Sequence, residues 1–157
     1  LDLPETRFEA AVTRAQWPAR LQRLKTGPLK DMAPDADLWL DGGHNAAAGQ
    51  ALASHLAQQS LRPTYLICGM LNTKDVAGYL APMAPYVAEL FAVSIPGEAN
   101  TLPAETTATA AKSVGMAATA ADTVNAAVAK ILKSDPASRI LICGSLYLAG
   151  TVLADNA

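Results

Sequence analysis

The chain has 157 residues, 51% of them hydrophobic, but 33 are alanine, which adds helix propensity more than core volume. The length favours one domain with its own core, because a chain of this size buries about 70% of its extended-state surface on folding. A formal net charge of −2 argues against nucleic acid or an anionic membrane surface as a partner.

Targeting signals are also missing from the sequence. No apolar run approaches the roughly 18–20 residues that cross a bilayer, and residues 1–10 lack the basic start and apolar segment of a signal peptide. We therefore expect a cytoplasmic protein without a membrane partner. Because the chain begins at Leu1 rather than at methionine, we also expect a piece of a longer protein or a processed chain.

The first forty residues differ from the rest of the chain. Residues 19–29 have an extended pattern with a Gly27-Pro28 turn, which predicts an antiparallel edge or hairpin strand. Residues 30–37 are polar and predict a loop.

From residue 38 onward, predicted strands and helices alternate. Continuous apolar runs, typical of strands covered on both faces, occupy 38–41, 64–69, 87–95 and 139–144. A further short strand is expected near 116–119. Helical spacing predicts helices over 45–59, 75–84, 102–114 and 122–133. The alternation favours an α/β fold with a mostly parallel sheet and helices on both faces.

Smaller signals refine this prediction. Asp122 is the expected N-cap of the helix over 122–133. A pattern of strand, Ile-Cys-Gly and helix occurs at 65–81 and again at 139–154, so another helix is expected after Gly144. Cys68 and Cys143 lie within apolar runs and are expected to be buried free thiols. A Cys68–Cys143 disulfide and a cysteine nucleophile paired with His44 are the weaker alternatives.

Three polar segments follow predicted strands, at 41–45, 70–75 and 145–147. Ligands of open parallel sheets lie outside the carboxyl ends of the strands, so these segments are expected to converge on one site. The Asp-Gly-Gly-His-Asn segment at 41–45 suits a ribose or a phosphate, because a carboxylate accepts from hydroxyls and a helix start faces anions. Alternatively, Asp41 and Asn45 merely cap the helix and the glycines make the turn.

Several common motifs are absent. The chain has no G-x-G-x-x-G fingerprint, no Walker A loop, no G-x-S-x-G elbow and no C-x-x-C pair. Two histidines are too few for an ordinary histidine-rich zinc site, and no metal ligands are expected.

Four segments carry a resemblance to a known family: WPARLQRL (17–24), LWLDGGHNAAAGQALASHL (38–56), ICGMLNTKD (67–75) and LICGSLYLAG (141–150). In this order and spacing, the chain resembles the C-terminal domain of bacterial folylpolyglutamate synthase/dihydrofolate synthase, of the Mur ligase superfamily, over about residues 15–154. The sequence departs from the family pattern at three positions, where Ala19, Gly43 and Ala46 replace the usual Gly, Ala and Pro.

The resemblance implies a single Rossmann-like domain over residues 1–157, belonging to an ATP-dependent ligase. In this family, ATP phosphorylates a carboxylate of dihydropteroate or a folate, and the amine of L-glutamate attacks the acyl phosphate. The Walker A loop and most of the metal site belong to an N-terminal ATPase domain that this chain lacks. ATP and Mg²⁺ would serve the full-length enzyme without being held by this domain alone, and the isolated chain is expected to be inactive.

The resemblance also assigns residues. Arg20, Asp41, His44 and Asn45 would lie on the nucleotide side, and Lys74, Ser145 and Tyr147 on the glutamate side, with His44 and Lys74 as the catalytic candidates. Simpler roles stay open for several of them: a solvated edge charge for Arg20, a helix start for Lys74, an N-cap for Ser145, core packing for Tyr147 and a loop histidine for His44.

Two other functions also stay open. The chain could be a stand-alone α/β module that binds a nucleotide or an amino acid, or a domain of another Mur-type ligase that acts on cell-wall precursors. A G-x-x-x-x-G-K-[ST] motif encoded upstream of Leu1 would favour the folate ligase over the stand-alone module.

Overall fold

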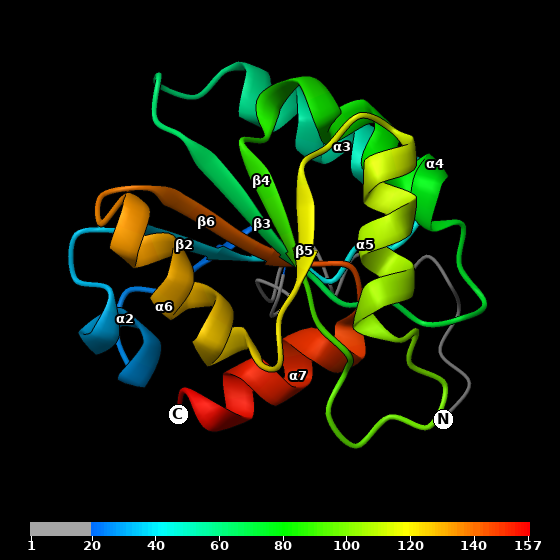
Figure 1. Cartoon of the computed structure of the whole chain (residues 1–157). Coiled ribbons are helices and arrows are strands. Elements are labelled where there is room, and N and C mark those ends of the chain that lie inside the picture. The colour runs from blue at the N-terminus through cyan, green and yellow to red at the C-terminus, as the bar shows by residue number, and fades with distance from the viewer. Residues whose placement is uncertain (1–19) are drawn as a thin grey trace, which may run out of the picture.

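The computed structural model describes residues 20–157, so the expectations that fall on residues 1–19, including Ala19, lie outside it. Six strands form one mixed sheet in the order β1-β2-β6-β3-β4-β5 (Figure 1). All neighbouring strands are parallel except β1 and β2, which are antiparallel. The strands are β1 (Gln22–Arg23), β2 (Asp37–Leu40), β3 (Thr64–Cys68), β4 (Glu89–Ala92), β5 (Ala118–Ala120) and β6 (Arg139–Cys143).

Helices cover both faces of this sheet (Figure 1). They are α2 (Pro28–Met32), α3 (Ala46–Ala57), α4 (Val76–Leu80), the 3₁₀ helix η1 (Ala81–Tyr86), α5 (Ala104–Ser113), α6 (Val124–Ser134) and α7 (Leu146–Asp155). Helices α2, α6 and α7 pack on one face, and α3, α4, η1 and α5 pack on the other. The predicted α/β architecture, with its antiparallel edge strand, is therefore confirmed.

Strand β6 shows how the sequence produces the two layers. Successive side chains of a strand point to opposite faces. Ile140 and Ile142 accordingly pack with α6 and α7, whereas Leu141 and Cys143 pack with α3, α4 and α5. All five residues of β6 are buried, which is why residues 140–143, after Arg139, are a continuous apolar run rather than an alternating one.

The amino-terminal prediction was partly wrong. Strand β1 has only two residues, and α2 lies where the sequence predicted the end of an extended segment and a polar loop. Pro28 stands in the first turn of α2, where its fixed φ suits a helix and its missing N–H is not needed. The backbone N–H of Leu29 donates to Asn156 Oδ1 at 2.8 Å, so a contact with the far end of the chain holds this turn.

Other boundaries also need correction. The helix predicted over 75–84 is α-helical only to Leu80 and continues as η1, in which Pro82 and Pro85 cannot donate backbone hydrogen bonds. The strand predicted over 87–95 is shorter than expected, because β4 spans only Glu89–Ala92. The N-cap of α6 is Thr123 rather than Asp122, because Thr123 Oγ1 accepts from Ala126 N at 3.0 Å. Within residues 20–157, no helix is long and apolar enough to span a membrane.

Candidate functional site

The carboxyl ends of β2, β6, β3 and β4 lie along one edge of the sheet, and we call the loops that follow them the rim. The rim comprises residues 41–45, 69–75, 93–103 and 144–147. Two of its glycines bring these loops into contact. A Cβ on Gly42 would collide with the Leu146 side chain, and a Cβ on Gly144 would lie 2.6 Å from the Gly69 carbonyl oxygen. The three segments expected to converge therefore share this edge.

Asp41 organises the first rim loop. Its Oδ1 accepts from Gly43 N at 2.7 Å, and its Oδ2 accepts from Leu21 N at 3.0 Å. The side chain is buried. Asp41 therefore shapes the glycine turn and also fastens the segment before β1 to the rim. Since Arg20 precedes Leu21, this contact brings the Arg20 backbone to the rim, and the Arg20 side chain is exposed.

His44 and Asn45 continue this loop into α3. Asn45 is the N-cap of α3, and its Oδ1 accepts from Ala48 N at 2.8 Å. The half-buried His44 ring places Nδ1 3.3 Å from the Gly42 carbonyl oxygen. With Nδ1 donating its proton to this carbonyl, Nε2 of the neutral ring is an acceptor. Among residues 20–157, Nε2 has no hydrogen-bond partner, so it is free to contact a ligand.

Lys74 lies in the loop between β3 and α4 and is half-buried. Its neighbour Asp75 is the N-cap of α4, with Oδ1 accepting from Gly78 N at 3.0 Å. No salt bridge or side-chain hydrogen bond joins Lys74 to another residue of the described chain. The helix-start alternative therefore applies to Asp75, whereas the ammonium group of Lys74 is available to an anion.

Ser145 and Tyr147 begin α7. Ser145 is buried and is the N-cap, with Oγ accepting from Tyr147 N at 3.0 Å. This contact confirms the capping alternative for Ser145 and leaves its hydroxyl proton available as a donor. Tyr147 is 58% exposed, so the core-packing alternative for this residue is wrong.

The sequence reading missed one rim loop, residues 93–103. Leu71 pairs with Thr101 in an isolated antiparallel bridge, and Asn72 N donates to the Asn100 carbonyl at 2.9 Å. Thr101 Oγ1 accepts from Ile95 N at 2.7 Å and holds the loop together. The Pro96-Gly97 pair and the polar residues after it indicate a loop, but the apolar run before them predicts a strand that continues to residue 95.

The two cysteines lie side by side beneath the rim, because Cys68 of β3 pairs in register with Cys143 of β6. Both are free thiols and both are buried, so the disulfide alternative is wrong. A side-chain hydrogen bond with Cys143, together with burial, raises the pKa of the Cys68 thiol well above its ordinary value. Cys68 is therefore a poor nucleophile at neutral pH.

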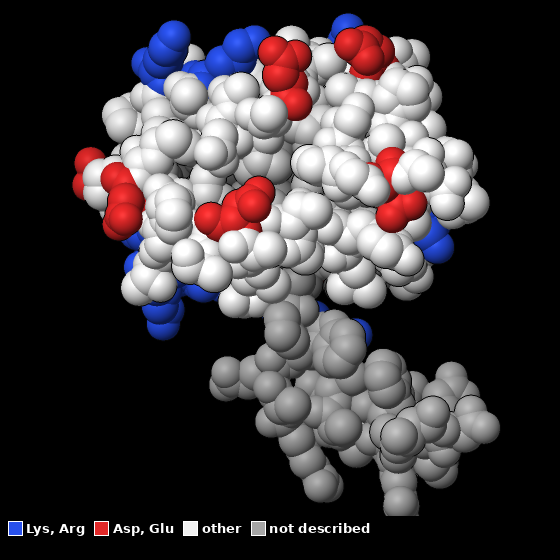
Figure 2. Space-filling model, turned by 90° about the horizontal axis from the view of Figure 1, so that it is seen from below, with Lys and Arg blue, Asp and Glu red and all other residues white. Residues whose placement is uncertain are grey.

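The rim carries little positive charge of its own. It lies at the bottom of Figure 1, and Figure 2 views the molecule from that side: acidic side chains are scattered over the face and basic ones lie at its margins. Arg20 and Lys74 are the lysine and arginine residues of the rim and of the segment that Asp41 holds against it. In the part of the chain that the structure describes, no three His, Cys, Asp or Glu residues are placed to hold a metal ion.

The family model described as "Dihydrofolate synthetase, C-terminal domain" matches residues 23–155, which include every rim loop. The chain belongs to this family. A folylpolyglutamate synthase of Lacticaseibacillus casei is 30% identical over 138 residues, covering 88% of this chain and 29% of the relative. The chain therefore spans less than a third of that relative.

Solved structures of folylpolyglutamate synthases are also similar to this chain. Folylpolyglutamate synthase of Mycobacterium tuberculosis, complexed with ADP and AMPPCP, is 27% identical with a TM-score of 0.71, over 87% of this chain and 31% of that one. A bifunctional folylpolyglutamate synthase/dihydrofolate synthase of Yersinia pestis is 24% identical with a TM-score of 0.68, over 98% and 34% of the two chains. At this identity, the second structure supports the fold alone.

Proposed function

We propose that this chain is the C-terminal domain of a folylpolyglutamate/dihydrofolate synthase, an ATP-dependent ligase that adds L-glutamate to dihydropteroate or to a folate. The family match over residues 23–155 carries the proposal, because it includes the rim and its free side chains. The residues 1–157 would form one domain, and an N-terminal ATPase domain of the same polypeptide would supply the Walker A loop. We expect this enzyme to work in the cytoplasm.

In the proposed reaction, ATP phosphorylates a substrate carboxylate and the glutamate amine then attacks the acyl phosphate. An amide bond forms, and ADP and phosphate leave. The rim would contribute mainly by positioning the two reactants and by placing charge near the phosphoryl group.

On the nucleotide side, we assign Arg20, Asp41, His44 and Asn45. Asp41 accepts from Gly43 N in the glycine turn and from Leu21 N before β1, and its remaining lone pairs can accept from ribose hydroxyls. His44 Nε2 and the exposed amide of Asn45 are available at the same loop. The exposed guanidinium of Arg20 would pair with a phosphate. Solved M. tuberculosis folylpolyglutamate synthase was crystallised with ADP, which supports a nucleotide on this family's site.

On the glutamate side, we assign Lys74, Ser145 and Tyr147. The unpaired ammonium of Lys74 would bind a substrate carboxylate, and Ser145 has a hydroxyl proton to donate. Tyr147, two residues after Ser145, presents an exposed phenol. Magnesium would neutralise phosphate charge, and we place its ligands mainly outside the described residues, which contain no cluster suited to it.

Single substitutions in the longer protein that contains this chain test these assignments. We expect His44→Ala and Asp41→Ala to raise the KM for ATP and Lys74→Ala to raise the KM for glutamate, each by about tenfold. Lys112→Ala, an exposed lysine on α5, is the matched control and should change neither constant. Unchanged KM values and rates in the three site variants would remove these residues from the mechanism.

Activity assays with different substrates distinguish the proposed function from two alternatives. A domain of a cell-wall ligase would support ADP formation with muramyl precursors rather than with dihydropteroate or tetrahydrofolate. A stand-alone binding module would bind a nucleotide or an amino acid without turnover. We expect glutamate-dependent ADP formation with the pterin-containing substrates.

A further inference from the structure

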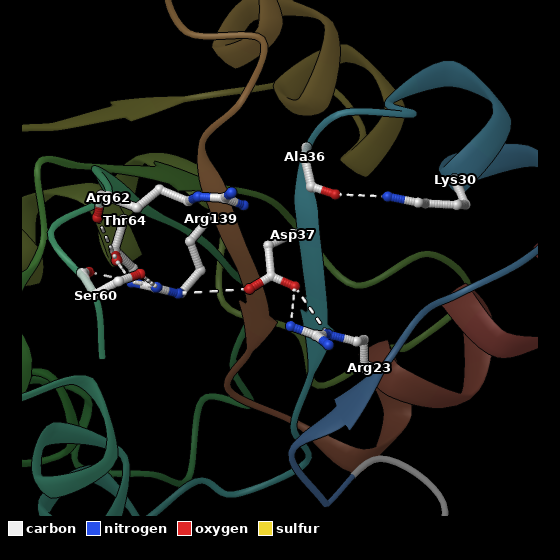
Figure 3. Close-up of polar contacts among 8 residues, drawn as sticks. All are labelled: Arg23, Lys30, Ala36, Asp37, Ser60, Arg62, Thr64 and Arg139. Atoms are coloured by element: carbon white, nitrogen blue, oxygen red, sulfur yellow. Dashed lines mark hydrogen bonds and ion pairs between the residues drawn. The ribbon is translucent and has the colours of Figure 1, made fainter. Parts of the chain in front are cut away.

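A second polar cluster lies at the opposite end of the sheet from the rim. Asp37, Thr64 and Arg139 are the first residues of β2, β3 and β6. These strands are adjacent and parallel, so the three side chains gather at the amino edge of the sheet. Figure 3 shows this cluster together with Arg23, Ser60 and Arg62. The ligase reaction proposed for the rim makes no use of it.

A cavity of about 500 Å³ opens beside this cluster and is lined by Asp37 and Arg139 among others. Its charged lining consists of two acidic residues, Asp35 and Asp37, and five basic ones: Arg23, Lys25, Lys30, Arg62 and Arg139. The lining thus has a formal charge of +3 in a chain whose net charge is −2. Five of the 12 lysine and arginine residues of the chain are concentrated here, so the cavity is a local positive site.

Arg139 forms the floor of this cluster and is only 4% exposed. Its Nη1 donates to Thr64 Oγ1 at 3.1 Å, and its Nη2 donates to Ser60 Oγ at 3.2 Å. Its Nε is buried without a hydrogen-bond acceptor and lies 3.7 Å from Asp37 Oδ2. A buried guanidinium N–H without an acceptor is costly, so Asp37 balances the charge of Arg139 without satisfying its Nε.

Asp37 is shared between two guanidinium groups. Its Oδ1 accepts from Arg23 Nε at 2.9 Å, while Oδ2 faces Arg139. Burial lowers the pKa of Arg139, Asp37 partly offsets this change, and the charges of Arg62 and Arg23 lower it further. The Asp37 carboxylate therefore balances only part of the positive charge of these arginines.

Arg62 and Lys30 differ in what their charges do. Lys30 Nζ donates to the carbonyl oxygens of Pro34 and Ala36 at 2.9 and 2.7 Å, so it holds the loop before β2. The exposed side chain of Arg62 reaches from the loop before β3 toward the start of β6, and no interaction is drawn from its guanidinium (Figure 3). Among residues 20–157, the Arg62 guanidinium has no hydrogen-bond or ion-pair partner.

We propose that this cavity binds a small molecule that carries two or more oxyanion charges, held by the guanidinium of Arg62 and attracted by the positive charge of Arg139 beside it. Guanidinium groups match the planar oxygen pairs of carboxylates and phosphates, so a phosphate compound and a polycarboxylate share the required chemistry. The volume of about 500 Å³ is within the range of small-molecule sites.

A purely structural role explains only part of the cluster. Arg139 joins the starts of β2 and β3, and that role accounts for Asp37, Ser60 and Thr64. It does not account for Arg62, whose side chain fastens nothing in the described chain. Arg62 is therefore the residue whose substitution separates a ligand site from a structural staple.

Calorimetric titration of the chain with inorganic pyrophosphate and, separately, with citrate tests the proposal. We expect at least one of the two anions to bind, and Arg62→Gln to weaken that binding about tenfold while leaving the circular dichroism spectrum unchanged. Binding of pyrophosphate alone identifies a phosphate compound, and binding of citrate alone identifies a polycarboxylate. The matched control is Lys112→Gln, which removes the same charge from an exposed position outside the cavity.

Backbone amide chemical shifts locate the binding. Titration of either anion that binds should move the signals of Ser60, Thr64 and Arg139 rather than those of the rim residues 41–45. The proposal is overturned if the wild-type chain binds neither anion, if shift changes are confined to the rim, or if Arg62→Gln and Lys112→Gln weaken binding equally.

Discussion

At the scale of single residues, Asp41 has one role in the fold and another in the proposed chemistry. Both of its carboxylate oxygens accept backbone N–H groups, and the side chain is buried. Removing it would leave Leu21 N and Gly43 N without their acceptor. A fall in activity of an Asp41 variant is therefore informative only beside its free energy of unfolding.

We expect Asp41→Ala to lower the free energy of unfolding by about 1–3 kcal/mol, because two part-buried N–H groups lose a charged acceptor. Urea unfolding of the chain measures this change. Asp122→Ala, at an exposed position, is the control and should stay within about 0.5 kcal/mol of the wild type. Equal stability of the two variants would show that the Asp41 contacts contribute little to folding.

The raised pKa of the Cys68 thiol predicts that the folded chain loses stability at alkaline pH. The folded pKa of this thiol is raised through the hydrogen bond with Cys143 and burial, while an unfolded thiol titrates near its ordinary value of about 8.5. Above that pH the unfolded chain loses a proton that the folded chain keeps, so stability declines as the pH rises. Below it, the stabilisation is fully present.

Urea unfolding of the wild type and of Cys68→Ala between pH 7 and 10 checks this expectation. The variant should be less stable at pH 7, since it leaves a small cavity, and its deficit should shrink as the pH rises. A deficit of constant size across this range would contradict a raised thiol pKa.

The contacts of single residues could be predicted from the sequence where a short local pattern determines them. Asn45 follows a strand and two glycines, and it caps α3 as its side chain allows. Arg139 was missed because its partners Thr64 and Ser60 lie 75 and 79 positions away. A basic residue at the start of an apolar run has no local signature of such contacts.

At the scale of elements, glycines show how the rim is closed. Gly144 has a φ of 110° and lies against the Gly69 carbonyl, so a side chain there meets both backbone strain and a collision. Gly150 lies within α7 with no neighbour in the way of a Cβ. The two glycines of one segment should therefore respond to substitution in opposite directions.

We expect Gly144→Ala to destabilise the chain by more than about 1 kcal/mol and Gly150→Ala to stabilise it by about 0.5–1 kcal/mol. Thermal unfolding of both variants, each compared with the wild type, provides the measurement. Destabilisation by Gly150→Ala of the same size as by Gly144→Ala would contradict the assigned conformations.

The start of α6 provides another test at this scale. Thr123→Ala removes the side-chain acceptor for Ala126 N and should cost about 1 kcal/mol of stability. Asp122→Ala should cost little, because Asp122 is outside the helix and exposed. Urea midpoints of the two variants distinguish the observed cap from the one predicted; the reverse order would restore Asp122 as the cap.

Elements were predictable where apolar periodicity was strong and were not where distant contacts decide. The helices α3 and α6 and the strands β3 and β6 follow their apolar spacing closely. Helix α2 does not, since five residues are too few for a periodic signal and a hydrogen bond from Leu29 N to Asn156 Oδ1 holds it. Proline spacing explains why α4 gives way to η1, which a count of apolar residues could not show.

At the scale of the whole molecule, the parallel sheet explains why distant segments share one edge. Residues 41–45 and 144–147 meet because β2 and β6 are neighbours and both end there. That convergence followed from the predicted fold class. The strand order and the fourth rim loop, residues 93–103, did not, because pairing between strands leaves no mark in the local sequence.

The central claim is that this chain forms one part of a ligase whose ATPase part lies elsewhere in a longer polypeptide. Glutamate-dependent ADP formation, measured side by side for the 157-residue chain and for the longer protein that contains it, tests this claim most directly. We predict turnover with dihydropteroate or tetrahydrofolate by the longer protein and none by the chain alone. Robust ligase activity of the isolated chain, or no glutamate-dependent turnover by the longer protein with either substrate, would contradict the account.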